Sequence, residues 1–223
     1  MLYITGDLHG DVSRLARTHK LKKGDTLLVL GDFGVLWYGD KRDAKTLKWL
    51  KRRRYTVLFL DGVHENYALL DAVETAEYGG AKAGKLADNV YHLLRGEIYE
   101  IEGKTVFAFG GGDAESEWEF RADADATWER QTPSGDEMSR GYETLAAAGN
   151  RVDVIATHFP SGKTNGYFAA RHGDDVRLRG VHVYFNRLEE TVAFDHWYFG
   201  SLHADRPCGS RHTAVFEEIL KVE

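Results

Sequence analysis

One run of residues organises this chain: Leu2-Tyr3-Ile4-Thr5-Gly6-Asp7-Leu8-His9-Gly10. An apolar segment, typical of a buried strand, ends abruptly in a carboxylate and an imidazole two positions apart. Side chains at positions i and i+2 of a strand point the same way, so Asp7 and His9 can face one ion. The flanking glycines let the backbone turn and approach a ligand closely. The run therefore predicts a strand that delivers two metal ligands, although such a pair alone is more often a loop cap beside a surface imidazole.

The same arrangement recurs at four later points of the chain. In each, an apolar run suited to a strand ends at a residue that can bind a metal: residues 26–30 precede Asp32, 56–60 precede His64, 152–157 precede His158 and 194–199 precede His203. Ligands of open α/β sheets bind in the crevice beyond the carboxyl ends of the strands, so these groups can converge. A mixed set of carboxylates and imidazoles suits a divalent ion such as manganese, iron or zinc.

The segments that follow the first three strands have helical spacing. Apolar positions predict three helices, over residues 11–17, 40–53 and 66–76. A flexible connector is expected over the glycine-rich residues 79–84. Three strands then follow closely, over residues 90–94, 97–101 and 105–109, with hairpin turns at 95–96 and 102–104. His92 lies inside the first of these strands and is expected to be structural.

The second half of the chain begins with a helix signal. Ser134, with Glu137 three positions later, forms a capping box that predicts a helix to about Ala148. Further elements are expected as a helix over residues 165–171, a helix through Leu188 and Val192, and a strand over 212–219. The change from alternating strands and helices to consecutive strands predicts an α/β fold of two packed sheets with helices outside.

Composition places the chain among ordinary soluble globular proteins, with 43% hydrophobic and 12% aromatic residues. Its 223 residues suffice for one sizeable core, so we predict a single domain over residues 1–223. The lone Cys208 excludes an internal disulfide. Met1 leads directly into the first strand without a secretory leader, and no apolar run reaches membrane-spanning length. We therefore expect a cytoplasmic protein with no membrane partner.

Negative charge is concentrated in one segment. The net charge is −6, and residues 113–137 hold nine acidic side chains against Arg121 and Arg130. No basic face dominates the remainder, so a long nucleic acid is not expected as a partner. Long loops are usually functional or disordered, and the aromatic residues here argue against disorder. We expect an acidic loop at about 113–135, either a lid beside the crevice or a surface excursion packed by its own tryptophans.

Five short blocks resemble, in order and spacing, those of the calcineurin-like metallophosphoesterases, especially compact bacterial and phage members. They are Asp7-Leu8-His9, Gly31-Asp32, Gly62-Val63-His64-Glu65, Thr157-His158 and Gly200-Ser201-Leu202-His203. The resemblance spans nearly the whole chain and is specific because the blocks form an ordered set. It implies a two-sheet β-sandwich flanked by helices, which agrees with the element pattern.

The resemblance also implies roles for individual residues. Asp7, His9 and His203 would hold the first metal, Asp32 would bridge two metals and His158 would serve the second. His64 would act as the acid or contact the phosphate. Two such ions lower the pKa of a bound water and clamp the oxygens of an in-line attack on phosphorus.

Two positions depart from the family pattern, and both affect the second metal. Val63 stands where the family has asparagine, and Ser201 stands where it has the first histidine of Gly-His-x-His. The first site is complete, whereas the second retains Asp32 and His158 and is expected to be missing, weakly held or completed by water and substrate, as magnesium often is. A nearby carboxylate could complete it if it points inward: Asp61, Glu65 or Asp205.

Two classes of function follow. The first is a metal-dependent hydrolase of phosphate esters, using manganese, iron, zinc or magnesium, with one tight site, a weaker second one, and Asp32 and His64 indispensable. The second is a silenced member of the fold that binds or scaffolds, or an inactivated variant of an active parent in which Val63 and Ser201 are introduced. The retention of all six ligand-type residues favours the enzyme.

Substrate selection is expected to lie in loops 33–38 and 113–133. The acidic loop favours a small phosphate ester. Four aromatic residues in these loops either stack on a base or pack among themselves: Trp37, Tyr38, Trp118 and Trp128. The sequence does not determine whether the substrate is a monoester or a diester, nor the oligomeric state.

Overall fold

The computed structural model describes residues 1–113, 130–172 and 180–223, and within these ranges it contains two sheets. The first sheet consists, in spatial order, of β13 (Leu220–Lys221), β1 (Leu2–Thr5), β2 (Thr26–Val29), β3 (Thr56–Phe59), β6 (Val90–Leu93), β5 (Ala81–Ala87) and β4 (Thr75–Tyr78). The second consists of β11 (Arg206–Pro207), β12 (His212–Ala214), β10 (Ala193–Phe199), β9 (Arg151–Thr157), β8 (Lys104–Phe109) and β7 (Glu97–Ile101).

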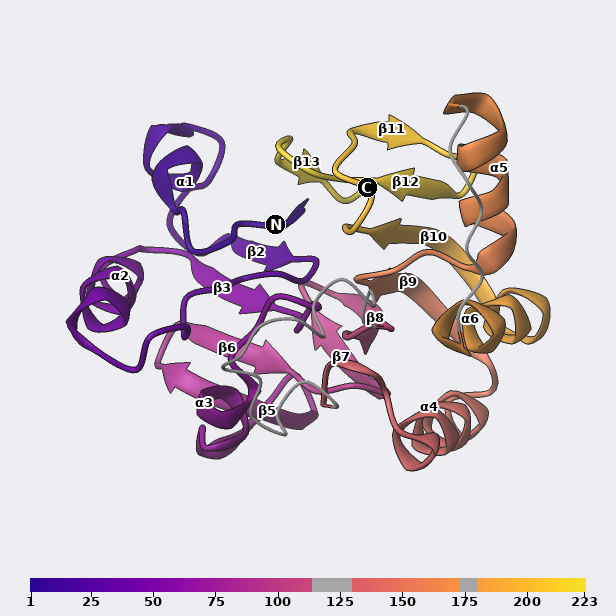
Figure 1. The fold of residues 1–223 in the computed structure, drawn as a ribbon, viewed down its shortest axis with the longest axis horizontal. Coiled ribbons are helices and arrows are strands. Elements are labelled where there is room, and N and C mark those ends of the chain that lie inside the picture. The colour runs from indigo at the N-terminus through magenta and orange to yellow at the C-terminus, as the bar shows by residue number, and fades with distance from the viewer. Residues whose placement is uncertain (114–129, 173–179) are drawn as a thin grey trace, which may run out of the picture.

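Helices lie on the outer side of each sheet (Figure 1). The first sheet is accompanied by α1 (Ser13–Arg17), α2 (Lys41–Lys51) and α3 (Tyr67–Asp71). The second is accompanied by α4 (Gly135–Ala147), α5 (Gly162–His172) and α6 (Gly180–Thr191). This is the predicted α/β architecture of two sheets flanked by helices, so the fold expectation is confirmed.

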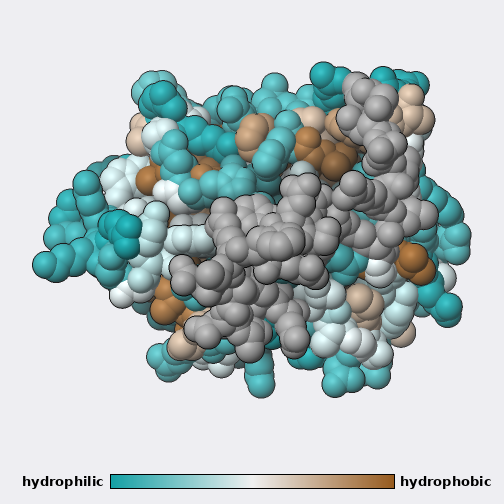
Figure 2. Space-filling view, viewed as in Figure 1, coloured by the Kyte–Doolittle hydropathy of each residue, from teal (hydrophilic) through white to brown (hydrophobic). Residues whose placement is uncertain are grey.

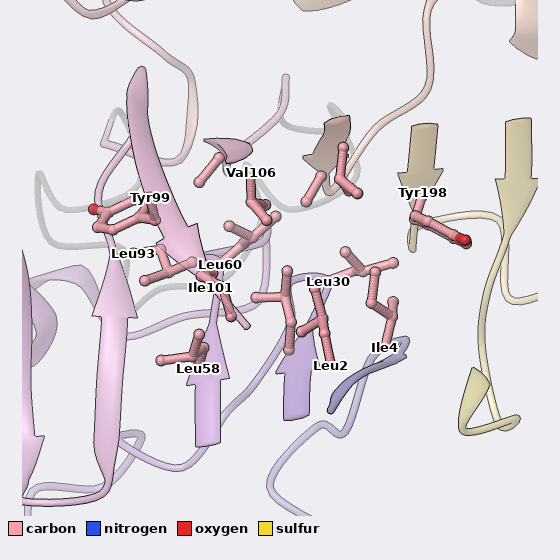
Figure 3. Close-up of a cluster of buried hydrophobic side chains, with 14 of the residues drawn as sticks. Leu2, Ile4, Leu30, Leu58, Leu60, Leu93, Tyr99, Ile101, Val106 and Tyr198 are labelled. Carbon is pink, nitrogen blue, oxygen red and sulfur yellow. The ribbon is translucent and has the colours of Figure 1, made fainter. Parts of the chain in front are cut away.

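The core follows from the alternation of side chains along each strand. Leu58 of β3 and Leu60 just after it pack with Ile101 and Val106 of the second sheet, and this cluster fills the space between the sheets (Figure 3). The intervening residues face outward, so that Phe59 packs under α1–α3 and the corresponding residues of β8–β10 pack under α4–α6. Strands buried on both faces explain why these runs are almost wholly apolar.

Parallel pairing brings the outgoing ends of the central strands together. Thr5, Val29 and Phe59 are aligned across β1, β2 and β3. Thr157 and Phe199 are aligned across β9 and β10 in the other sheet. The chain leaves each sheet at one edge, and the residues after these positions can meet in one crevice.

Most of the predicted elements are present. Ser134 accepts the backbone N–H of Glu137, and the Glu137 side chain accepts the backbone N–H of Ser134, so the capping box exists. The helices expected at 11–17 and 40–53 and the strands at 90–109 are also confirmed. His92 lies in β6, where its ring contacts the Asp61 carboxylate 3.1 Å away, as expected of a structural histidine.

Several expectations about connections are wrong. Residues 79–84 are not a flexible connector, because β4 and β5 form an antiparallel hairpin and only Gly79 and Gly80 turn. Residues 95–96 are not a hairpin turn but the crossing from β6 in one sheet to β7 in the other. The helix expected over 66–76 ends at Asp71. Of the strand expected over 212–219, only β12 is formed, and β13 follows it in the other sheet.

The surface in view is mainly hydrophilic outside the grey atoms, with small hydrophobic patches (Figure 2). Among the described residues, no helix combines the length and apolar character needed to cross a membrane. The acidic segment that the sequence analysis expects as a loop or lid lies largely in residues 114–129, outside the described residues.

Candidate metal centre

The six residues singled out at strand ends converge, although the two sheets supply them separately. Three overlapping groups of potential ligand atoms lie within 4.8 Å of one another in the described residues: Asp7, His9 and His203; His9, Asp32 and His64; and Asp7, Asp32 and His158. The loops after β1, β2 and β3 bring Asp7, His9, Asp32 and His64, and those after β9 and β10 bring His158 and His203. The crevice therefore joins the edges of both sheets.

The backbone at three of these residues is left-handed. The φ angles are 46° at His9, 43° at Asp32 and 45° at His203. L-residues with side chains rarely adopt this region, and such strain clusters at functional sites. It turns the chain sharply after each strand, so that the side chain faces the crevice instead of following the sheet.

Close approach of backbone at this crevice requires glycine. A Cβ at Gly62 would lie 2.0 Å from Asp32 Oδ1, and one at Gly200 would lie 2.5 Å from Asp7 Oδ1. Both carboxylates therefore sit directly against main chain from neighbouring loops. The glycines of the sequence blocks provide the space in which these carboxylates lie.

Asp32 is the hub of the cluster. Its Oδ1 accepts the backbone N–H of His64 at 2.7 Å, and its Oδ2 lies 2.6 Å from His64 Nδ1. Burial by itself raises the pKa of the Asp32 carboxyl, but the charge of His158 and the hydrogen bonds from His64 outweigh burial and lower it. The same hydrogen bond raises the pKa of His64. Asp32 is thus held as a carboxylate, and His64 is held in one orientation.

His158 lies between the two buried carboxylates, with its Nδ1 3.7 Å from Asp7 Oδ1. Its Nδ1 donates to the Leu30 carbonyl at 2.9 Å, which leaves Nε2, 3.6 Å from Asp32 Oδ1, as the nitrogen that can bind a metal. In metal sites the second ring nitrogen is usually oriented by such a backbone partner. His158 is 1% exposed, so this orientation is fixed by buried surroundings.

The buried polar atoms fit a cation. Asp7 Oδ1 and His158 Nε2 are buried without a hydrogen-bond partner in the described residues. Buried polar atoms without a partner are costly unless a proton or a cation lies near them. On the other side of Asp7, Oδ2 lies 3.0 Å from His203 Nε2, and this contact raises the pKa of His203. The donor set suits a divalent ion.

The three carboxylates considered for the second site are engaged by other groups. Asp61 is engaged by Arg95, Glu65 accepts the backbone N–H groups of Phe33 and Gly34, and Asp205 accepts those of residues 216–218. Because each is occupied by these donors, the possibility that one of them completes the second site gains no support. The Ser201 hydroxyl is buried and has no hydrogen-bond partner in the described residues.

Three supporting residues were not recognised from the sequence. Arg14 donates to the carbonyls of Gly6 and Asp7 and so braces the first loop. Glu65 fixes the loop after Asp32, as described above. Arg95 donates from Nε and Nη2 to Asp61 Oδ2, at 2.8 and 2.5 Å, in a buried pair below the His64 loop. Arg14 stands in a short helix and Arg95 stands beside a glycine, and neither setting gives a sequence signal for such contacts.

The fold is that of the calcineurin-like metallophosphoesterases, a class defined by two sheets flanked by helices. A model of the calcineurin-like phosphoesterase family matches residues 2–204, and the chain belongs to this family. Comparison with the curated proteins finds no match. Among solved structures, phosphopantetheinyl hydrolase (PptH) from Mycobacterium tuberculosis is similar at 15% sequence identity, with 96% of this chain and 89% of that chain covered and a TM-score of 0.43.

Proposed function

We propose that this protein hydrolyses small phosphate esters with a divalent metal ion: manganese, iron, zinc or magnesium. The proposal rests on the convergence of six ligand-type side chains on one crevice, where two buried atoms have no hydrogen-bond partner among the described residues. The family supports phosphoester hydrolysis in general. The lone cysteine is a buried free thiol, and we place the activity in the cytoplasm.

The residues divide into one complete site and one reduced site. Asp7, His9, Asp32 and His203 would hold the first ion. Asp32 and His158 would hold a second ion weakly, because Val63 offers no lone pair and Ser201 only a neutral hydroxyl. A bound ion would lower the pKa of a coordinated water and polarise the phosphoryl oxygens.

His64 supplies proton transfer in this proposal. Its Nδ1 is held by Asp32, and the pKa of the ring is raised by that hydrogen bond. A protonated imidazole in this position can donate to the leaving oxygen as the ester bond breaks. His64 and His9 both line a groove in which the organic part of the ester can lie.

The decisive experiment measures hydrolysis of an aryl phosphate monoester and diester with added manganese, in the wild-type protein and in Asp32→Ala. We expect turnover and bound metal in the wild type, and the loss of both in the variant, because Asp32 contributes to two of the three ligand groups. Metal bound in stoichiometric amount without turnover would instead indicate a binding or scaffold protein, or an inactivated variant of an active parent.

The reduced site can be tested by restoring its ligands. Val63→Asn combined with Ser201→His is expected to raise the metal content measured by elemental analysis from about one towards two ions per chain, and to raise turnover. Ser201→Ala is the matched control and should leave both unchanged. Unchanged metal content in the double variant would show that these positions do not face the second site.

A further inference from the structure

A groove of about 730 Å³ opens directly beside the candidate metal centre. His9 and His64 line its inner end, and Val35, Trp37 and Tyr38 line it further along the loop after β2. Sites for small molecules usually have volumes of roughly 300–1,000 Å³ and are lined by apolar and aromatic groups with a few polar ones. The groove therefore has the size and lining to receive the organic part of a small ester.

The loop that forms the outer wall is held rigidly. The Asp43 carboxylate accepts the backbone N–H groups of Trp37, Tyr38 and Gly39 at 2.8–2.9 Å. Asn66, two residues after His64, donates its side-chain amide to the Trp37 carbonyl at 2.9 Å. The wall is thus fixed to α2 on one side and to the His64 loop on the other.

Tyr38 is presented to solvent on this rigid loop. Its side chain is 54% exposed, although burial of an aromatic ring would be favourable. The guanidinium of Arg42 lies over the ring, with Cζ 3.2 Å from the ring centroid. Arg42 is itself paired with Asp40 at 2.8 Å, so its charge is already compensated. The Tyr38 ring is thus half exposed beside the groove, with Arg42 over one of its faces.

We propose that Trp37 and Tyr38 form a shelf that binds a planar aromatic group of the substrate, a nucleobase or a simple aryl ring. The inference rests on the proposed function, because the inner end of the same groove would hold the phosphate. Aromatic shelves bind flat rings by stacking on their faces. The lining carries both signs of charge at this end: the carboxylates of Asp11 and Asp43 and the guanidinium of Arg42.

The test uses three phosphonates, whose carbon–phosphorus bond resists hydrolysis, titrated calorimetrically into the manganese-loaded protein. They are phenylphosphonate, the phosphonate analogue of adenosine monophosphate, and propylphosphonate. We expect the aromatic compounds to bind about tenfold more tightly than the propyl compound. Tyr38→Ala should abolish this advantage and Tyr38→Phe should keep it. A preference for the adenosine compound over phenylphosphonate would identify a nucleobase as the natural group.

A matched control lies elsewhere on the surface. Tyr167 on α5 is 42% exposed and is also covered by an arginine, Arg171, with Cζ 4.6 Å from its ring centroid. Tyr167→Ala should leave the aromatic preference intact. Equal affinities for the three phosphonates, no measurable binding of the aromatic ones, or a preference that survives Tyr38→Ala would overturn the shelf.

Turnover of phenyl phosphate and propyl phosphate, measured in parallel, separates this inference from the proposed function. Turnover of both esters with equal phosphonate affinities would keep the hydrolase and overturn the shelf. Aromatic preference that depends on Tyr38, without turnover of any ester, would overturn the hydrolase and support the shelf.

Discussion

His64→Gln is expected to lower kcat for an alkyl phosphate ester by a factor of about 10²–10⁴, the usual contribution of a general acid. Glutamine keeps a hydrogen-bonding group near Asp32 but cannot carry a transferable proton. The loss should be smaller for an ester with a good leaving group such as nitrophenol, because that oxygen departs with less need of a proton. The measurement is kcat for both esters under manganese saturation.

Metal content distinguishes this role from metal binding. His64 belongs to one of the three ligand groups, so its loss could also remove an ion. We expect the metal content of His64→Gln to equal that of the wild type and of His19→Gln, an exposed histidine outside the cluster. Parallel loss of metal and activity would show that His64 is a ligand and not the acid.

Asp61→Asn is expected to lower the free energy of unfolding by about 3–5 kcal/mol, the usual cost of breaking a buried ion pair from one side. The Asp61 and Arg95 side chains are only 2% and 3% exposed. Arg95 lies at the crossing between the sheets and also donates to the carbonyls of Arg130 and Gln131. In the variant, the buried guanidinium charge of Arg95 loses its Asp61 partner at a point where both sheets meet.

A surface pair provides the control for this prediction. Asp195 pairs with Arg151 at 3.0 Å, with both side chains 62% exposed, and Asp195→Asn should cost no more than about 1 kcal/mol. Chemical denaturation of the two variants measures the difference. Equal losses of unfolding free energy in Asp61→Asn and Asp195→Asn would show that the buried pair stabilises the fold no more than a surface pair.

The pH dependence gives the same prediction a second readout. Burial alone would raise the pKa of Asp61, but Arg95 and the His92 hydrogen bond hold it well below its usual range. A depressed pKa contributes stability that is present above the unfolded-state pKa of about 4 and is lost as the pH falls towards the folded-state value. The difference in the free energy of unfolding between the wild type and Asp61→Asn should therefore become smaller below pH 4.

The strand ends were predictable because their signals are local. An apolar run that stops at Asp7, Asp32 or His158 predicts both a strand and a ligand at its end. Parallel pairing then brings the strand ends together. The capping box at Ser134 was predictable for the same reason, since both partners lie within one turn.

The wrong expectations depend on contacts distant in sequence. Residues 81–84 carry no β-branched side chain, yet they form a strand because Ala83 and Gly84 pair with β6. The residues at 95–96 have the composition of a tight turn, but Arg95 is drawn to Asp61 and the chain crosses to the other sheet. The carboxylate of Glu65 could bind a metal as far as the sequence shows. The structure shows that it instead accepts the backbone N–H groups of Phe33 and Gly34 and so supports a loop.

The left-handed backbone at His9, Asp32 and His203 places candidate metal ligands at a cost in conformational stability. Each of these conformations costs on the order of 1 kcal/mol for a residue with a side chain, and glycine would adopt it freely. Selection of variants for thermal stability alone would therefore favour glycine at these three positions. Those glycines would remove two imidazoles and the Asp32 carboxylate, and with them the candidate metal centre.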